Sequence, residues 1–204
     1  MTWAAAIVAG GFARRLDGRD KTALAIGGRS ILERQLAAIR PLTDQIFVVA
    51  NDPDRFAGTG LPVFEDLVPG TGALGGIHTA LSVATTDRVL VVACDLPFLT
   101  GRFLAYLTSV GPDADVTIPR PRHGYQPLCA VYGRACLDPL RRRLAGGTLR
   151  AQDLTADVRT RELGPDELAP FDLDGVLFFN VNTPEDYRRA QRLAAARQTQ
   201  PDSA

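Results

Sequence analysis

The stretch Trp3–Lys21 reads WAAAIVAGGFARRLDGRDK and joins a short apolar run to a glycine turn and a basic loop. The run Trp3–Val8 has no polar alternation, which is typical of a strand buried on both faces of a sheet. Gly10 and Gly11 follow it almost directly. Because glycine lacks a Cβ atom, these residues let the chain turn sharply and let a ligand approach the backbone. The stretch therefore predicts a buried strand that leads into a candidate binding loop.

The loop after the two glycines carries four cationic side chains, Arg14, Arg15, Arg19 and Lys21. Successive amides in a turn attract anions, and cationic side chains pair with phosphate oxygens, so the loop fits a phosphate clamp. The same residues also fit a plain turn with a solvated charged face. The loop lacks the Gly-Lys-Ser/Thr ending of a Walker A motif and the third glycine of the dinucleotide fingerprint. From these residues alone, both interpretations stay open.

Strand and helix patterns alternate along the rest of the chain. A capping box of Ser30 and Glu33 marks the start of one helix, and Pro41 marks its end. A second glycine-rich loop, 69–76, precedes a helix that runs through Ala84. This alternation predicts a Rossmann-like three-layer α/β sandwich, a mostly parallel sheet with helices on both faces. The other predicted strands are 45–50, 62–66, 88–93, 115–119, 128–132 and 176–182, and the other predicted helices are 103–110, 134–144 and one starting at Pro184.

Polar side chains follow several predicted strands at the point where each strand ends, namely Asn51, Asp66 and Asp95. Because parallel strands end at one edge of a sheet, we expect these residues to lie along one crevice with the first glycine turn. A carboxylate at Asp95 fits a Mg²⁺ ligand, with Asn180 or Asn182 as a second oxygen donor. It also fits a helix cap or a turn aspartate, which need no metal.

The composition is that of a globular chain of 204 residues, of which 46% are hydrophobic. Lys plus Arg and Asp plus Glu both total 23, which argues against bulk binding of nucleic acid. No apolar run approaches the roughly 20 residues that span a bilayer, and no basic segment precedes the first apolar run as in a signal peptide. We therefore expect a cytoplasmic protein that binds neither membranes nor nucleic acid.

The scattered cysteines and histidines give no metal-ligand spacing. An odd number of cysteines without a Cys-x-x-Cys pair suggests free cytosolic thiols. We expect His78 to be a surface or hydrogen-bonded residue. The chain has no Gly-x-Ser-x-Gly and no His-Glu-x-x-His motif, so chemistry on a nucleoside triphosphate with Mg²⁺ is the class that fits best. The cysteines are Cys94, Cys129 and Cys136.

Several motifs in fixed order, from Ala6 to about Leu193, resemble the molybdenum cofactor guanylyltransferases, a family of MobA-like nucleotidyltransferases. They are Val8-Ala9-Gly10-Gly11 with Arg15-Leu16 and Asp20-Lys21, Gly72-Ala73-Leu74-Gly75-Gly76, Cys94-Asp95-Leu96-Pro97-Phe98, Gln126-Pro127-Leu128 and Asn180-Val181-Asn182-Thr183-Pro184-Glu185-Asp186. Leu16, Ala73 and Gln126 depart from the methionine, proline and histidine usual in the family. The resemblance implies a nucleotide-diphospho-sugar transferase-like fold and transfer of GMP from GTP to the terminal phosphate of molybdopterin.

The resemblance also implies roles for individual residues. Lys21, Asp95 and Arg15 would be catalytic, Asp95 with Asn182 would bind Mg²⁺, and Gln126 with Asn180 would contact the acceptor. The implied partners are GTP and molybdopterin, with other cofactor-assembly proteins and target molybdoenzymes as transient ones. The nucleotide would be bound by Val8, Ala9, Gly10, Gly11, Lys21, Asn51, Asp66, Gly75 and Asp95.

We expect a single domain over 1–197, with a nucleotide-binding half, 1–110, an acceptor-binding half, 111–197, and a disordered tail, 198–204. The nearest alternative is a CTP-dependent molybdenum cofactor cytidylyltransferase, whose first loop tends to carry Ala-Ala-Gly. The sequence here has Ala9-Gly10-Gly11, which favours guanine. Other small-molecule nucleotidyltransferases and a non-catalytic nucleotide-binding protein are further alternatives.

Overall fold

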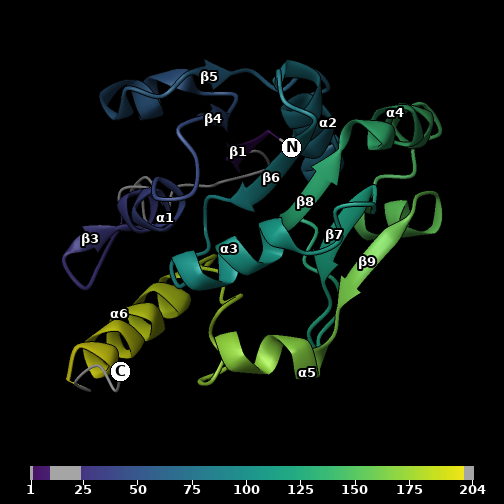
Figure 1. The fold of residues 1–204 in the computed structure, drawn as a ribbon. Coiled ribbons are helices and arrows are strands. Elements are labelled where there is room, and N and C mark those ends of the chain that lie inside the picture. The colour runs from purple at the N-terminus through teal and green to yellow at the C-terminus, as the bar shows by residue number, and fades with distance from the viewer. Residues whose placement is uncertain (1, 10–23, 200–204) are drawn as a thin grey trace.

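A seven-stranded sheet forms the middle layer of the computed structural model, which describes residues 2–9 and 24–199 (Figure 1). The first glycine loop, with Gly10, Gly11, Arg15 and Lys21, and residues 200–204 of the predicted tail lie outside the described residues. The strand order is β5-β4-β1-β6-β8-β7-β9, and only β8 runs antiparallel to its neighbours. The strands are β1 (Trp3–Val8), β4 (Ile46–Val49), β5 (Val63–Phe64), β6 (Arg88–Ala93), β7 (Val116–Pro119), β8 (Cys129–Gly133) and β9 (Thr160–Leu163).

Helices cover both faces of the sheet, as the strand and helix alternation predicted. Ala5 and Ile7 of β1 pack in one core cluster with residues of α1 and α3, whereas Ala6 and Val8 pack in another with residues of α2 and α4. Successive side chains of a strand point to opposite faces, so β1 serves both cores. The helices are α1 (Ile31–Ile39), α2 (Gly72–Val83), α3 (Gly101–Ser109), α4 (Leu137–Ala145), α5 (Pro165–Leu168) and α6 (Pro184–Thr199), with short 3₁₀ helices η2 (Pro53–Thr59), η3 (Arg134–Cys136), η4 (Ala151–Ala156) and η5 (Ala169–Phe171). No helix in the described ranges is long and apolar enough to cross a membrane.

A small hairpin, β2 (Ala25–Ile26) and β3 (Arg29–Ser30), leads into α1. Its two turn residues, Gly27 and Gly28, both have positive φ, 59° and 79°, as a type I′ turn requires. The predicted capping box is confirmed: the Ser30 hydroxyl accepts from the Glu33 amide at 3.2 Å, and the Glu33 carboxylate accepts from the Ser30 amide at 2.7 Å. The hairpin packs against α6 in a third core cluster.

The predicted strand 176–182 is wrong, since this segment forms turns in the structure. Its apolar side chains are buried in the cores without strand pairing, for example Leu177 and Val181. The Leu177 amide donates instead to the Asp172 carboxylate at 2.7 Å. The last strand of the sheet is β9, which pairs in parallel with β7 at the sheet edge. Its polar sequence, Thr-Arg-Glu-Leu, gave no strand signal.

The predicted glycine loop 69–76 is too long, because α2 already begins at Gly72. Gly76 lies in this helix where it packs on the end of β1. A Cβ atom at Gly76 would lie only 2.5 Å from Cγ1 of Val8. Glycine therefore allows α2 to approach the sheet closely.

We expect Gly76→Ala to lower the free energy of unfolding by about 1–3 kcal/mol, the usual cost of overpacking a core. The stiff, buried Val8 side chain cannot move away easily. Urea denaturation checks this. Gly58→Ala is the matched control, because nothing lies within 4 Å of its Cβ position and its φ is not positive. Equal stability of the two variants would contradict the packing argument.

Candidate functional site

The carboxyl ends of four parallel strands meet at one edge of the sheet. The Ala9 amide donates to the Val49 carbonyl at 2.8 Å, and the Cys94 amide donates to the Val8 carbonyl at 3.1 Å. β1, β4 and β6 therefore end level with one another, and the Ala50 amide extends the edge to β5 by donating to the Phe64 carbonyl at 2.9 Å. The predicted convergence of strand ends is confirmed for the described residues.

Asn51 and Asp66 are brought together at this edge. The Asp66 amide donates to Oδ1 of Asn51 at 3.2 Å. Oδ1 of Asp66 accepts from the Thr79 hydroxyl at 2.8 Å and from the Val68 amide at 3.1 Å. Thr79, fully buried on α2, thus fixes the loop that carries Asp66. Sequence reasoning missed Thr79, whose only signal is a polar side chain on a buried helix face.

Gly75 lies in the first turns of α2 and packs against the same loop. A Cβ atom there would lie 2.2 Å from the Thr71 hydroxyl oxygen and 3.1 Å from Oδ2 of Asp66. A side chain at this position would displace the loop. Gly75 thereby keeps the backbone at the start of α2 next to the Asp66 carboxylate.

Asp95 follows β6 and is half-buried. Its carbonyl accepts a hydrogen bond from the Val181 amide at 3.0 Å. Asn180 and Asn182 flank Val181 and are both exposed. The segment predicted wrongly as a strand therefore still lies beside Asp95, as the metal-site hypothesis required. The Thr183 cap of α6 is confirmed, because its hydroxyl accepts from the Asp186 amide at 3.1 Å.

Gln35 on α1 holds the turn that carries Asp95. Its Nε2 donates to the carbonyl oxygens of Ala93 at 2.7 Å and Leu96 at 3.1 Å, and the residue is 1% exposed. These two carbonyls bracket Asp95 along the chain. One amide side chain thus fixes both ends of the turn. Sequence reasoning missed Gln35 because it occupies an otherwise apolar helix face and gives no motif.

Gln126 lies at the same edge, just before the antiparallel β8. The Ala93 amide donates to the Leu128 carbonyl at 2.7 Å, which places the start of β8 beside the end of β6. A cavity of about 320 Å³ lies further along this edge, after β7 and β9. Arg122, His123 and Asp166 are among its lining residues.

His78 on α2 corrects an expectation, since it is neither at the surface nor hydrogen-bonded among the described residues. It is 8% exposed, and both ring nitrogens are buried without a described partner. Burial lowers the pKa of His78, the nearby Arg141 lowers it further, and Asp66 opposes them. Folding therefore favours the neutral form of the His78 imidazole.

The oxygen donors at the edge fit a hard divalent cation. Mg²⁺ usually binds one or two carboxylates together with substrate phosphates. Asp95 supplies a carboxylate, and Asn180 and Asn182 belong to the segment that contacts it. In residues 2–9 and 24–199, no group of three or more His, Cys, Asp or Glu side chains is placed so that it could hold a metal ion by itself.

A mostly parallel sheet whose strand ends carry this donor set defines a nucleotidyltransferase-type α/β protein. A family model described as the MobA-like NTP transferase domain matches residues 5–160. The chain belongs to this family of nucleotidyltransferases, as its motifs predicted.

Relatives and solved structures agree with this assignment. The chain is 32% identical over 186 residues to a molybdenum cofactor guanylyltransferase of Desulfosudis oleivorans, covering 91% of this chain and 92% of that one. It is 38% identical over 140 residues to a probable molybdenum cofactor guanylyltransferase of Clostridium perfringens, covering 69% and 70%. The crystal structure of molybdopterin-guanine dinucleotide biosynthesis protein A from Archaeoglobus fulgidus superposes with a TM-score of 0.78 at 27% identity, covering 96% of this chain and all of that one.

We expect acidification to destabilise the protein through His78. Because its pKa is lowered by folding, the unfolded chain takes up a proton first, and stability falls as the pH drops below the ordinary histidine pKa. We expect His78→Leu to reduce the loss of unfolding free energy between pH 7.5 and 5.5, measured by urea denaturation. Arg141→Gln should reduce this loss in part, because the charge of Arg141 contributes to the lowered pKa of His78. A pH dependence unchanged by His78→Leu would show that this imidazole does not control it.

Proposed function

We propose that this protein transfers GMP from GTP to the terminal phosphate of molybdopterin and releases pyrophosphate. The observation that carries the proposal is the shared edge, where Asp95 and the Asn51–Asp66 pair flank the end of β1. The basic loop follows β1 in the sequence. The names of the relatives support these substrates, since one is called a molybdenum cofactor guanylyltransferase, another a probable one, and a solved structure is that of a molybdopterin-guanine dinucleotide biosynthesis protein A.

The nucleotide occupies the ends of β1, β4 and β5 in this proposal. Asn51 and Asp66 contact the nucleoside, and Gly75 leaves room for it beside α2. Arg15 and Lys21 neutralise the triphosphate. Lys21 is the only lysine among 23 basic residues, so the chain uses arginine at every other cationic position. A compact ammonium group differs from a planar guanidinium as a phosphate ligand. The backbone of the first loop contacts the phosphates through Val8, Ala9, Gly10 and Gly11.

Asp95 and Asn182 would hold Mg²⁺, which neutralises phosphate charge when it is bound. Gln126 and Asn180 orient the acceptor on the other side of Asp95. A phosphate monoester has a second pKa of about 6, so the acceptor oxygen is largely ionised at neutral pH and needs no strong general base. This oxygen attacks the α-phosphorus in line, the bond to the β-phosphate breaks, and pyrophosphate leaves with the bonding electrons. The transfer requires no covalent enzyme intermediate and no catalytic histidine.

The cellular setting follows from the reaction. The protein acts in the cytoplasm, and cofactor-assembly proteins or target molybdoenzymes contact it transiently. The division into a nucleotide half, 1–110, and an acceptor half, 111–197, fits the placement of Asn51 and Asp66 in the first and Gln126 and Asn180 in the second.

The proposal is tested by pyrophosphate release with molybdopterin and Mg²⁺, using GTP, CTP, ATP and UTP separately. We expect pyrophosphate release with GTP and none with CTP, ATP or UTP. Release with CTP instead would identify a cytidylyltransferase. Nucleotide binding without release would identify a non-catalytic nucleotide-binding protein.

We expect Asp95→Ala to lower turnover by at least about 100-fold, the scale for removing one group that stabilises transition-state charge. The variant should keep the wild-type melting curve, because Asp95 is half-buried at a turn. Asp44→Ala is the control, since Asp44 is exposed and precedes β4 at the opposite edge. A near-normal rate for Asp95→Ala would exclude Asp95 as the metal ligand.

We expect Gln35→Leu to raise the Mg²⁺ concentration needed for half-maximal activity several-fold. The change removes both hydrogen bonds that fix the Asp95 turn, and it should also cost about 1–3 kcal/mol of unfolding free energy because two buried carbonyls lose their donor. Gln45→Leu, at an exposed position, is the control. A less stable Gln35→Leu variant with an unchanged Mg²⁺ requirement would limit Gln35 to a structural role.

A further inference from the structure

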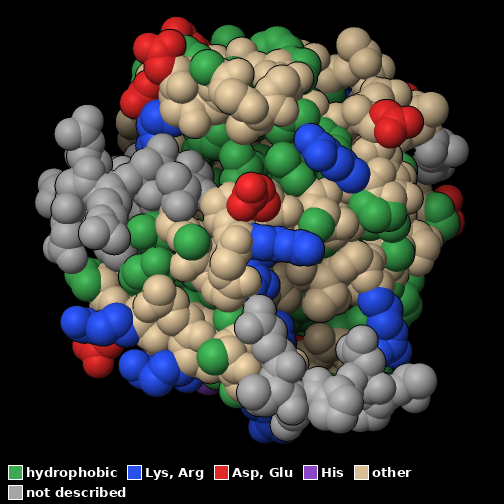
Figure 2. All heavy atoms as spheres, turned by 90° about the vertical axis from the view of Figure 1, so that its left-hand side faces the viewer, with side chains coloured by type: hydrophobic (Ala, Val, Ile, Leu, Met, Phe, Trp, Pro, Cys, Tyr) green, Lys and Arg blue, Asp and Glu red, His purple; other side chains and the backbone are tan. Residues whose placement is uncertain are grey.

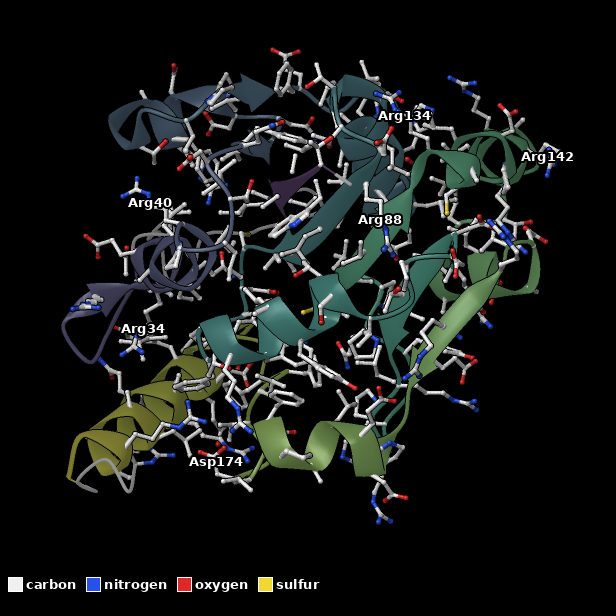
Figure 3. All side chains as sticks on the ribbon, in the orientation of Figure 1. Arg34, Arg40, Arg88, Arg134, Arg142 and Asp174 are labelled. Carbon is white, nitrogen blue, oxygen red and sulfur yellow. The ribbon has the colours of Figure 1, made fainter. Side chains whose placement is uncertain are left out.

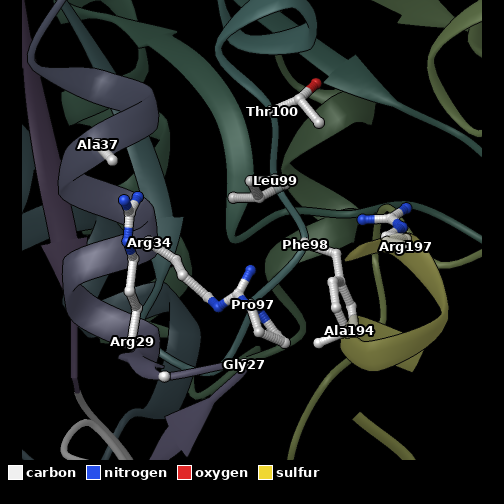
Figure 4. A pocket seen from close by; sticks show the side chains of 11 residues that line it. Gly27, Arg29, Arg34, Ala37, Pro97, Phe98, Leu99, Thr100, Ala194 and Arg197 are labelled. Atoms are coloured by element: carbon white, nitrogen blue, oxygen red, sulfur yellow. The ribbon is translucent and has the colours of Figure 1, made fainter. Parts of the chain in front are cut away.

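A cavity of about 590 Å³ opens on the side of the molecule that carries the β2–β3 hairpin, α1 and α6 (Figure 4). The segment between β6 and α3 forms another of its walls, through Pro97 to Thr100. Among the described residues, none of those assigned above to nucleotide, metal or acceptor lines it. The space-filling view of this side shows several separate basic side chains over the surface (Figure 2). The cavity is therefore separate from Asn51, Asp66, Asp95, Gln126, Asn180 and Asn182, the described side chains of the proposed active site.

The described residues that line the cavity include three arginines and neither aspartate nor glutamate. They come from three elements: Arg29 from β3, Arg34 from α1 and Arg197 from α6. Burial lowers the pKa of Arg34, and the charges of Arg29 and Arg197 lower it further. The arginines are thus close enough to repel one another, and an anion between them would relieve that repulsion.

Two of these guanidinium groups are already fixed in place. Nε and Nη2 of Arg34 donate to the Ile26 carbonyl, the former at 2.8 Å. Arg197 donates twice to the Asp174 carboxylate, at 2.8 Å each, and its guanidinium lies 4.9 Å from the centre of the Phe98 ring. Asp174 offsets the charge of Arg197, and Glu33 interacts with the charge of Arg29, whereas the charges that act on Arg34 are those of Arg29 and Arg197. Because these side chains are held before any ligand arrives, binding costs little side-chain entropy.

The hairpin that carries Arg29 is also held in position. The Tyr187 hydroxyl on α6 donates to the Ala25 carbonyl at 2.9 Å. Ile26 and Ala194 belong to the same buried cluster, which joins the hairpin to α6. The two sides of the cavity are therefore connected through packed residues.

The rest of the lining is mostly apolar. The volume of the cavity lies in the range of sites for small organic ligands. The chemistry needed is thus an anionic group for the arginines and an apolar body for the remaining wall. The apolar lining residues are Ala37, Pro97, Phe98, Leu99 and Ala194.

We propose that this cavity binds a small organic phosphate, with the phosphate between Arg29 and Arg34 and the organic part against Phe98 and Leu99. The proposal goes beyond the guanylyltransferase reaction and does not depend on it. Phosphate matches guanidinium groups in charge and hydrogen-bond geometry. The fixed guanidinium of Arg34, the charge of Arg29 and the apolar wall together make a site that inorganic phosphate fills only in part.

Isothermal titration calorimetry with phenyl phosphate and with inorganic phosphate tests the proposal. We expect phenyl phosphate to bind more tightly, because only it reaches the apolar wall. Arg29→Gln should weaken binding of phenyl phosphate by about tenfold through loss of a charge-assisted contact. Ala37→Glu should weaken it as well by adding a carboxylate to the wall. Both positions are exposed, so both variants should fold and keep guanylyltransferase activity.

Two controls distinguish the cavity from other anion sites. Arg40→Gln changes an exposed arginine beyond the end of α1, outside the cavity (Figure 3). Lys21→Ala changes the proposed nucleotide site. Both should bind phenyl phosphate like the wild type. Binding lost in Lys21→Ala, binding insensitive to Arg29→Gln and Ala37→Glu, or equal binding of the two probes would each overturn the proposal.

Discussion

The parallel pairing of β1 with β4 and with β6 is the interaction on which the site depends. Val8 is level with Val49 on one side and with Ala93 on the other. Parallel strands need both faces of the sheet covered, and residues 4–8 of β1 are buried on both faces. A slip of one residue would exchange the side chains that face α1 with those that face α2. The core therefore fixes the register, and the register fixes which residues follow the strand ends at one edge.

Local signals in the sequence were sufficient for this part of the molecule. A strand buried on both faces carries no polar positions, so β1 and β6 are recognisable as apolar runs. The start of α1 is equally local, because Ser30 and Glu33 satisfy each other within one turn. The rule that parallel strands end at one edge then placed Asn51, Asp66 and Asp95 correctly without any knowledge of the tertiary contacts.

Features set by distant contacts could not be predicted in this way. β9 is a polar edge strand, and only its pairing with β7 makes it extended. The segment 176–182 has the apolar content of a strand, yet it buries those side chains from turns. Gln35 and His78 carry polar groups into buried positions. Gln35 donates to carbonyl oxygens far along the chain, whereas the ring nitrogens of His78 have no hydrogen-bond partner among the described residues. No periodicity marks such positions, since one residue in a helix leaves the pattern intact.

The connection between β7 and β8 brings the second half of the chain to the edge used by the first. β8 runs opposite to β6, so its beginning, not its end, lies at the edge where β6 ends. Gln126 precedes β8 in the loop that follows β7, and its amide donates to the Pro119 carbonyl at the end of β7 at 3.0 Å. The later segment around Val181 returns to the same turn through its hydrogen bond to Asp95. In-line transfer needs donor and acceptor on opposite sides of one reacting phosphorus. The loop between β7 and β8 lies at this edge because β7 ends there and β8 begins there, so it adds a segment of the second half of the chain beside the loops that follow β1, β4 and β6. The topology thus suits an edge that has to hold two substrates at once.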